Sequence, residues 1–249
     1  MQRPLPAVQN RLLDSLPAED LGLIAPQLAL IDLERGRLLY DPGDRIDMVY
    51  FPHDGVISLM TLMENGAAIE SATIGREGAL GLMSAVAPRQ SLSRAIVQTP
   101  TRAARISAIH LHEAWHKSPR IRDLVDRHTE ALFGHAIQSV ACNALHSVEA
   151  RFCRWLLTCH DRISTDTVAL TQEFLADMLG VQRTTVTAVA RALQAKGAIR
   201  YRRGVVDIMD RVVLEQLACE CYGVIRKTYE RLLPEDEALA SPRLTAGRD

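Results

Sequence analysis

The stretch that decides the fold is LTQEFLADMLGVQRTTV, residues 170–186. Within it, Thr171 is a natural N-cap for a helix, and Glu173 places a carboxylate in the first turn, where it complements the helix dipole. Gly180 ends this helix at a position that commonly needs a left-handed backbone. A second helix is predicted to follow, with inward-facing apolar residues at Val186, Val189, Ala190 and Leu193. A short helix, a glycine-containing turn and a second helix together predict a helix-turn-helix.

The side of the second helix opposite these apolar residues is small, polar and basic. Residues 199–209 then read as a strand, a tight turn and a strand, which predicts a wing with a basic tip at Arg202 and Arg203. Although the formal net charge is -1, residues 182–206 contain six basic residues and no Asp or Glu. Such a basic segment in an otherwise acidic chain is typical of a surface that binds DNA phosphates. The alternative interpretation is an ordinary solvated helix face.

We therefore expect a DNA-binding site in which Arg183 contacts a guanine edge and neighbouring hydroxyl groups contact bases or phosphates. The basic wing tip is expected to meet the phosphate backbone. The candidate DNA-binding residues are Thr171, Gln182, Arg183, Thr184, Thr185, Thr187, Ala188, Arg191, Arg202 and Arg203.

Residues 31–106 read as short strands broken by turns. An Asn65-Gly66 pair between two apolar runs is a strong hairpin signal, and further glycines punctuate the segment. We expect a small antiparallel β-roll in which the sequence GREG, residues 75–78, forms a turn rather than a phosphate-binding loop. The preceding residues 9–28 have a helical pattern with one apolar side.

A long helix is expected from Ser118, a good N-cap followed by a proline, to about Asn143. One seam of this helix has alternating spacings of four and three: Ile121, Val125, His128, Leu132, His135, Ser139 and Cys142. We expect this seam to pair two copies of the chain in a homodimer. The other face, which is expected to contact the body of the protein, carries Phe133, Ile137, Val140 and Ala144. The two seam histidines are either a pH or metal sensor or ordinary polar residues satisfied by their surroundings.

The predicted fold class is α+β. It combines an N-terminal antiparallel β-roll of the jelly-roll or double-stranded β-helix type, a long dimerisation helix and a C-terminal winged helix-turn-helix. The expected boundaries are 10–117 for the roll, 118–146 for the dimerisation helix, 147–220 for the DNA-binding domain, and 221–249 for a C-terminal helix and frayed tail.

The composition, 47% hydrophobic and 24% charged, is typical of a soluble globular chain. No apolar run approaches the roughly 18 residues of a membrane helix, and the first residues lack a secretory signal, so we expect a cytoplasmic protein. Five cysteines, with no CxxC pair, indicate reduced thiols and predict neither a metal site nor a cofactor. Cys219 and Cys221 are expected in one helix, where residues two apart point in different directions, so ordinary packing is favoured.

With these features the chain resembles the Crp/Fnr family of bacterial transcription regulators over about residues 12–217. The resemblance depends on residues 170–186, on YDPGD at 40–44, VYF at 49–51 and GVI at 55–57, and on the order of the elements. It implies a homodimer that reads a two-fold symmetric site in double-stranded DNA and contacts RNA polymerase. The two recognition helices of such a dimer would lie about 34 Å apart.

The roll departs from the family members that bind cyclic AMP. Those carry a Gly-Glu pair and, further on, an Arg-Ser or Arg-Thr pair; here the two positions hold Gly81-Leu82 and Ser93-Arg94. The glutamate is absent, and the arginine is displaced by one residue, which turns a strand side chain to the opposite face. We expect cyclic AMP binding to be lost, with Gly81, Leu82, Ser93 and Arg94 as candidate pocket residues for an unknown small-molecule effector. An iron–sulfur sensor with N-terminal cysteines is not expected, because the first cysteine is Cys142.

The recognition helix also departs from the family. The frequent Arg-Glu-x-x-x-Arg triplet of base-reading residues is matched only at Arg183, because Thr184 and Ala188 occupy the other two positions. A missing carboxylate and a missing second arginine change the bases that can be read. We therefore expect an operator different from that of other family members.

Two other functions are alternatives to DNA binding. HEAWH, residues 112–116, fits the HExxH motif of zinc peptidases, but a catalytic zinc needs a third protein ligand, so a surface helix is favoured. The chain could instead bind an effector and use its helix-turn-helix for protein contacts. The prediction is a homodimeric, DNA-binding transcription regulator without enzymatic activity.

Overall fold

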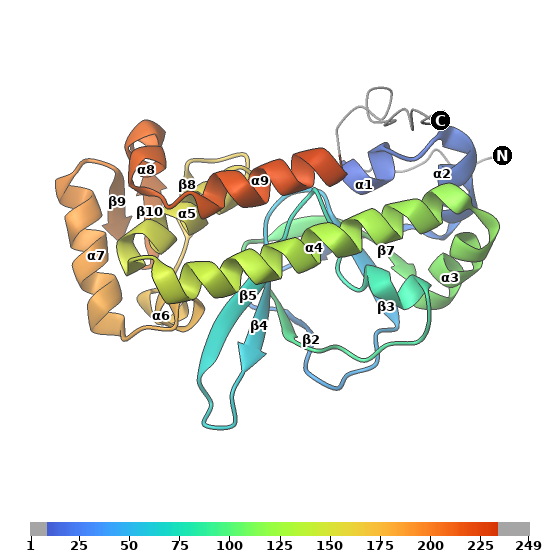
Figure 1. Cartoon of the computed structure of the whole chain (residues 1–249), viewed down its shortest axis with the longest axis horizontal. Coiled ribbons are helices and arrows are strands. Elements are labelled where there is room, and N and C mark those ends of the chain that lie inside the picture. Colours follow the sequence, from blue (N-terminus) through green and yellow to red (C-terminus); the bar gives the residue numbers. More distant parts are fainter. Residues whose placement is uncertain (1–8, 234–249) are drawn as a thin grey trace, which may run out of the picture.

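The computed structural model describes residues 9–233. The predicted frayed tail, 234–249, lies outside these residues. Figure 1 shows a β-roll and a helical part side by side, with one long helix crossing the molecule. This is the predicted α+β class.

The β-roll consists of two antiparallel sheets. The three-stranded sheet has the order β1 (Ala29–Leu33), β7 (Thr101–Ser107), β3 (Met48–Pro52). The four-stranded sheet has the order β2 (Leu38–Tyr40), β6 (Arg94–Val97), β4 (Ile57–Leu62), β5 (Ala68–Ile74). In β6, alternate residues are buried, as the pleat requires when one face covers a core. The predicted hairpin turn lies between β4 and β5, where Gly66 has a φ of 84°.

The predicted turn at residues 75–78 is confirmed, since the Gly78 amide donates to the Gly75 carbonyl at 3.0 Å. The helical pattern before the roll is confirmed as well, but it is divided into α1 (Arg11–Asp14), α2 (Ala18–Ile24) and the 3-10 helix η1 (Ala25–Gln27). Pro17 occupies the N-cap of α2, so the chain breaks there. After β7 come α3 (Ala108–Lys117) and the long helix, with η2 (Leu82–Ala85) earlier in the roll.

The long helix α4 (Pro119–Leu145) begins where predicted, because the Ser118 hydroxyl accepts a hydrogen bond from the Ile121 amide at 3.0 Å. The assignment of its two faces was wrong. The predicted dimer seam lies inside the chain: its buried members are Ile121, Val125, His128, His135, Ser139 and Cys142. Phe133, expected to contact the body of the protein, is 66% exposed, and Val140 is 72% exposed. The buried and exposed faces of α4 are the reverse of those predicted because strand β5 and a C-terminal helix both pack on the seam side of α4.

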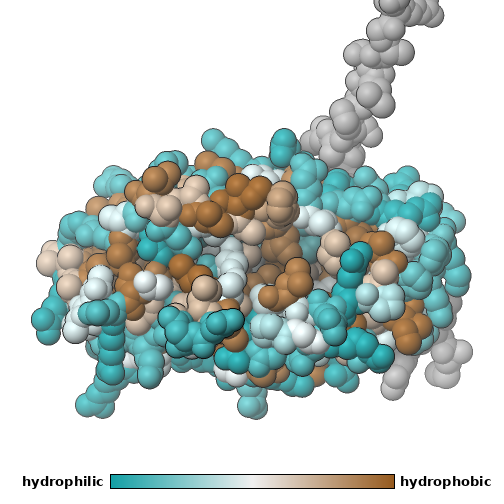
Figure 2. All heavy atoms as spheres, turned by 60° about the horizontal axis from the view of Figure 1, so that its bottom comes forward, coloured by the Kyte–Doolittle hydropathy of each residue, from teal (hydrophilic) through white to brown (hydrophobic). Residues whose placement is uncertain are grey.

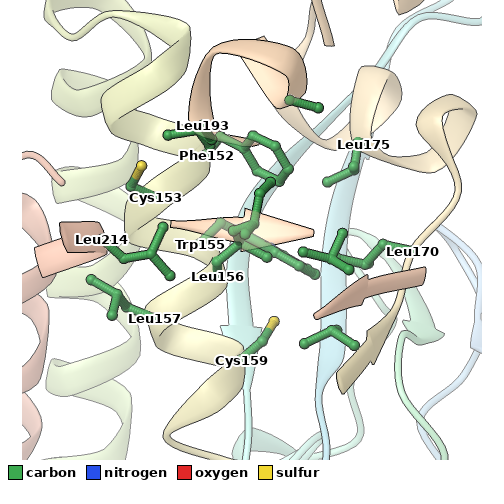
Figure 3. Close-up of a cluster of buried hydrophobic side chains, with 14 of the residues drawn as sticks. Phe152, Cys153, Trp155, Leu156, Leu157, Cys159, Leu170, Leu175, Leu193 and Leu214 are labelled. Carbon is green, nitrogen blue, oxygen red and sulfur yellow. The ribbon is translucent and has the colours of Figure 1, made fainter. Parts of the chain in front are cut away.

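The C-terminal part begins with α5 (Val148–His160), capped by Ser147 as predicted. It continues as β8 (Thr167–Ala169), α6 (Gln172–Leu179), α7 (Arg183–Ala195), β9 (Ile199–Arg202), β10 (Val205–Ile208), α8 (Arg211–Leu217) and α9 (Cys221–Leu232). Strand β8, not predicted from the sequence, pairs with β10 and completes a three-stranded sheet. Figure 3 shows the core of this part, where side chains of α5 such as Phe152 and Trp155 meet Leu175 and Leu193 from α6 and α7.

The helix α9 returns along α4 (Figure 1) and carries Ile225, Tyr229 and the following Leu233 into the core of the roll. This helix therefore fastens the C-terminal part to the roll. In the part of the chain that the structure describes, none of the helices has the length and apolar character needed to span a lipid bilayer.

Candidate DNA-binding surface

The helix-turn-helix consists of α6 and α7. The Thr171 hydroxyl accepts from the Phe174 amide at 3.2 Å and so caps α6 as predicted. Gly180 ends α6 with a φ of 63°, which a residue with a Cβ adopts only at a cost. The Val181 amide then donates to the Ala176 carbonyl at 3.0 Å and closes the turn.

One face of α7 is buried and the other is open. Val186, Ala190 and Leu193 are buried in the core, while Val189 is only partly buried. The candidate base-reading residues Arg183, Thr184 and Ala188 are exposed, as are Gln182 and Arg191; Thr185 and Thr187 are partly buried. Apart from these two threonines, the candidate DNA-binding residues on α7 have exposed side chains that a ligand can reach.

Gln172, which is not among the predicted DNA-binding residues, organises the start of α7. Its side-chain Oε1 accepts from Arg183 Nε at 3.3 Å and from the Thr187 hydroxyl at 3.2 Å. Gln172 is the first residue of α6, so this pair of bonds ties the two helices together. It uses the Nε–H of Arg183 and leaves the terminal guanidinium nitrogens for a bidentate contact, as guanine recognition requires.

The wing is the hairpin of β9 and β10. Arg203 and Gly204 form its two-residue turn with φ values of 45° and 79°, the left-handed pair that a tight hairpin needs. The basic segment 182–206, which contains no Asp or Glu, ends directly before Asp207. The carboxylate of Asp207 lies against arginines of this segment. Arg202 donates to it at 2.9 Å, and Arg200 lies 3.3 Å away. The hydrogen bond from Arg202 lowers the pKa of Asp207, so part of the wing's positive charge is neutralised.

A cavity of about 980 Å³ lies between the four-stranded sheet and α4. Three of the four candidate effector residues, Gly81, Leu82 and Ser93, line it, and Arg94 does not. Arg94 instead makes two hydrogen bonds to Asp41, at 2.8 and 2.9 Å, which lower the pKa of that carboxyl group. The arginine therefore has an anionic partner within the chain. Most of the lining is apolar and includes Leu59, Ala72, Ile74, Leu80, Leu132 and Phe133.

The two histidines expected on the dimer seam are core residues. His128 Nε2 accepts from the Ala79 amide at 3.1 Å, and burial lowers the pKa of His128 to about 4. Burial also lowers the pKa of His135 well below its ordinary value, helped by the nearby charges of Arg162 and Arg154. Both imidazoles therefore stay neutral near pH 7, which is contrary to a sensor that titrates there.

The HExxH histidines lie on α3, with their Nε2 atoms 3.1 Å apart, and His112 Nδ1 contacts the Ala85 carbonyl. Among residues 9–233, one group of three or more possible His, Cys, Asp or Glu ligands lies close together, and it contains neither His112 nor His116. Within those residues, the structure thus supplies no third ligand for a zinc held by this pair.

Comparison with known proteins gives two domain matches in the predicted order. Residues 30–118 match the cyclic nucleotide-binding domain, and residues 150–217 match the Crp-like helix-turn-helix domain. The two matches together span more than half of the chain. The chain belongs to the Crp/Fnr family of transcriptional regulators. This Crp/Fnr protein therefore acts in transcription regulation through a DNA-binding helix-turn-helix.

Two curated relatives are similar along most of their length. The chain is 23% identical to the global nitrogen regulator of Nostoc sp. strain PCC 7120 over 74% of this chain and 86% of the relative. It is 22% identical to the global nitrogen regulator of Synechococcus elongatus over 84% of this chain and 98% of the relative.

Solved structures share the fold. FixK2 from Bradyrhizobium japonicum matches with a TM-score of 0.66 and 17% identity, covering 77% of this chain and 98% of FixK2. A CRP/FNR family transcriptional regulator from Thermus thermophilus matches with a TM-score of 0.60 and 20% identity, covering 76% of this chain and 98% of that regulator.

Proposed function

We propose that this Crp/Fnr regulator binds a two-fold symmetric DNA site as a homodimer, with α7 of each subunit in the major groove and the wing on the adjacent phosphates. The observation that carries the proposal is the open face of α7, where Gln172 holds Arg183 by its Nε–H and leaves the terminal nitrogens for a base. Arg183 would read a guanine, and Thr184, Thr185, Thr187 and Ala188 would complete the base contacts. The remaining candidates, Thr171, Gln182, Arg191, Arg202 and Arg203, would position the helix on phosphates.

The exposed side of α4 supports the homodimer. Apolar side chains gather in a band across the upper part of the face shown in Figure 2. On α4, the large apolar side chains that are exposed are Phe133, Ile137, Val140 and Leu145. Spacings of four and three put Phe133, Ile137 and Val140 on one stripe, which is the pattern of a paired helix. The same stripe of a second copy would cover it.

The cavity supports control by a small molecule of apolar or amphipathic character. Its lining is mainly apolar, and the arginine that would hold a cyclic phosphate is paired with Asp41. Helix α4 contributes both to the cavity, through Leu132 and Phe133, and to the proposed dimer stripe. A ligand that prefers one arrangement of α4 would shift the dimer between states that differ in DNA affinity. Contact with RNA polymerase belongs to the same proposal, and membership of the Crp/Fnr family supports it.

Selection of bound sequences from random duplex DNA, with and without cyclic nucleotides, tests the proposal. The expected product is a symmetric site with half-sites separated by one DNA turn, about 34 Å, and unchanged by cyclic AMP. An asymmetric site would contradict the two-fold symmetric homodimer but not DNA binding. No enrichment together with no salt-dependent DNA affinity would favour an effector-binding protein that uses its helix-turn-helix for protein contacts.

A further inference from the structure

Three cysteines and one histidine from distant parts of the sequence meet where α4 ends and α9 begins. Cys142 lies in the last turn of α4, and His146 follows that helix as its C-cap. Cys219 lies in the break between α8 and α9, and Cys221 is the first residue of α9. One ligand atom from each of the four side chains lies within 4.8 Å of all the others.

The spacing of these atoms suits a metal ion. The Sγ atoms of Cys142 and Cys219 are 3.5 Å apart, and Cys221 Sγ lies 3.5 Å from His146 Nδ1. Tetrahedral zinc, with bonds of about 2.3 Å to sulfur and about 2.0–2.1 Å to nitrogen, separates two sulfurs by about 3.8 Å and a sulfur from a nitrogen by about 3.6 Å. A disulfide would need the two sulfurs at about 2.05 Å. These two separations are therefore closer to those of a tetrahedral ligand shell than to the sulfur–sulfur bond of a disulfide.

The surroundings orient the ligands. His146 Nε2 lies 3.1 Å from Glu220 Oε1, so the carboxylate holds the proton on Nε2 and leaves the lone pair of Nδ1 directed at the sulfurs. A carboxylate that fixes the outer nitrogen of a histidine in this way is the usual second layer of a zinc site. Gln138 Nε2 donates to Cys221 Sγ at 3.0 Å, and the guanidinium of Arg154 acts electrostatically on Cys142 and Cys219. The hydrogen bond from Gln138 and the positive charge of Arg154 both stabilise negatively charged sulfur, as a ligand set with three thiolates requires.

We propose that Cys142, His146, Cys219 and Cys221 bind one zinc ion and thereby fasten the start of α9 to the end of α4. Three thiolates and an imidazole are soft and borderline ligands that select zinc over magnesium or calcium. All three cysteines are buried, and four protein ligands leave no open position, so the site is structural and not catalytic. It lies where the DNA-binding part ends and α9 turns back along α4, so the ion stiffens the joint between the DNA-binding part and the roll.

The test is cobalt titration of the full-length protein, purified under reducing conditions, stripped of metal with a chelator and kept free of oxygen. One cobalt ion per chain should produce sulfur-to-cobalt charge-transfer absorption and the intense visible bands of tetrahedral cobalt, and zinc should abolish both. Absence of the charge-transfer band would overturn the proposal. So would a Cys142–Cys219 disulfide, found by mass spectrometry, in metal-free protein isolated separately without a reductant.

Matched variants identify the ligands. Cys219→Ser and Cys221→Ser should lose the charge-transfer band, whereas Cys153→Ala, which removes a buried cysteine outside the cluster, should keep it. Glu220→Gln should keep the spectrum and weaken zinc affinity about 10- to 100-fold, because only the orientation of the imidazole is disturbed. This variant keeps all four ligands, so it remains informative if a cysteine variant fails to fold. His112→Ala should have no effect; if it removed the cobalt signal, the ion would lie at the α3 histidine pair and the proposal would be wrong.

Discussion

The indole nitrogen of Trp155 donates a hydrogen bond to Glu70 Oε1 at 2.9 Å, which joins α5 of the DNA-binding part to strand β5 of the roll. Both residues are buried, with 1% of Trp155 and 8% of Glu70 exposed. Ser58 donates to the other carboxylate oxygen at 2.7 Å. A second buried link between the two parts is made by Arg162, which bonds to Thr73 Oγ1 at 2.6 Å and pairs with Glu77. The roll and the DNA-binding part therefore share a buried polar contact as well as the apolar contact made by α9.

Removing the indole donor should loosen this contact. Trp155→Phe keeps an aromatic ring in the core but leaves one oxygen of a buried carboxyl group without its partner, which costs about 1–3 kcal/mol of unfolding free energy. Urea denaturation measures the loss. Tyr201→Phe is the control, because its hydroxyl bonds to the Leu170 carbonyl within the DNA-binding part and is only partly buried. A Trp155→Phe protein as stable as the wild type would show that the hydrogen bond contributes nothing across the boundary.

Glu70 should also make stability depend on pH. Burial raises the pKa of Glu70 above its ordinary value of 4.5, although the bonds from Ser58 and Trp155 oppose the shift. Between the ordinary and the raised value the folded state holds more protons than the unfolded state, so the free energy of unfolding decreases as pH rises through that interval. Glu70→Gln removes this slope. Denaturation series from about pH 4 upward on both proteins isolate the contribution of Glu70, and parallel curves would contradict it.

Local signals in the sequence predicted much of this fold. Thr171, Ser118 and Ser147 cap helices where their side chains can satisfy free amides, and Gly180 ends α6, because such features depend on neighbours a few residues away. The strands of the roll and the wing followed from apolar runs separated by turns. These features need no knowledge of how the elements pack.

The missed features depend on tertiary packing. The apolar pattern of α4 has two candidate stripes, and only the docking of α9 and β5 decides which one is buried. The contact between Trp155 and Glu70 joins residues 85 positions apart. The contact between Cys142 and Cys219 joins residues 77 positions apart. The four-residue cluster was also hidden by the prediction of one helix through Cys219 and Cys221, since the chain breaks between α8 and α9.

A charge on the exposed stripe of α4 should separate the proposed dimer. Val140→Asp places a carboxylate within the proposed apolar contact between two copies, where its desolvation is not compensated. Sedimentation velocity should show a dimer for the wild type and a monomer for this variant. Val212→Asp, at an exposed apolar position on α8, is the matched control and should remain dimeric. If both variants stay dimeric, another surface pairs the subunits.

Loss of Arg183 should relax sequence preference more than it weakens binding overall. One bidentate guanine contact discriminates by about 1–3 kcal/mol, so Arg183→Ala should bind all four bases at one position of each half-site with similar affinity. Gln172→Ala should give a weaker form of the same change, because it removes only the group that orients the guanidinium. Competition binding on operator variants measures both. An unchanged preference in Arg183→Ala would mean that α7 is not the reading helix.

Substitutions in the wing should change DNA affinity in opposite directions, because the carboxylate of Asp207 neutralises part of the wing's positive charge. Arg203, at the tip, makes no ion pair among the described residues, so Arg203→Ala should weaken binding on all sequences and reduce the salt slope by about 1. Asp207→Asn should do the opposite, since it frees Arg200 and Arg202 for phosphates and should tighten binding at low salt with a steeper slope. Titrations of a fixed operator at several salt concentrations measure the slopes. Glu215→Gln, on α8, controls for the general gain of positive charge. An equal gain from this variant would show that Asp207 acts only through net charge and not through Arg200 and Arg202.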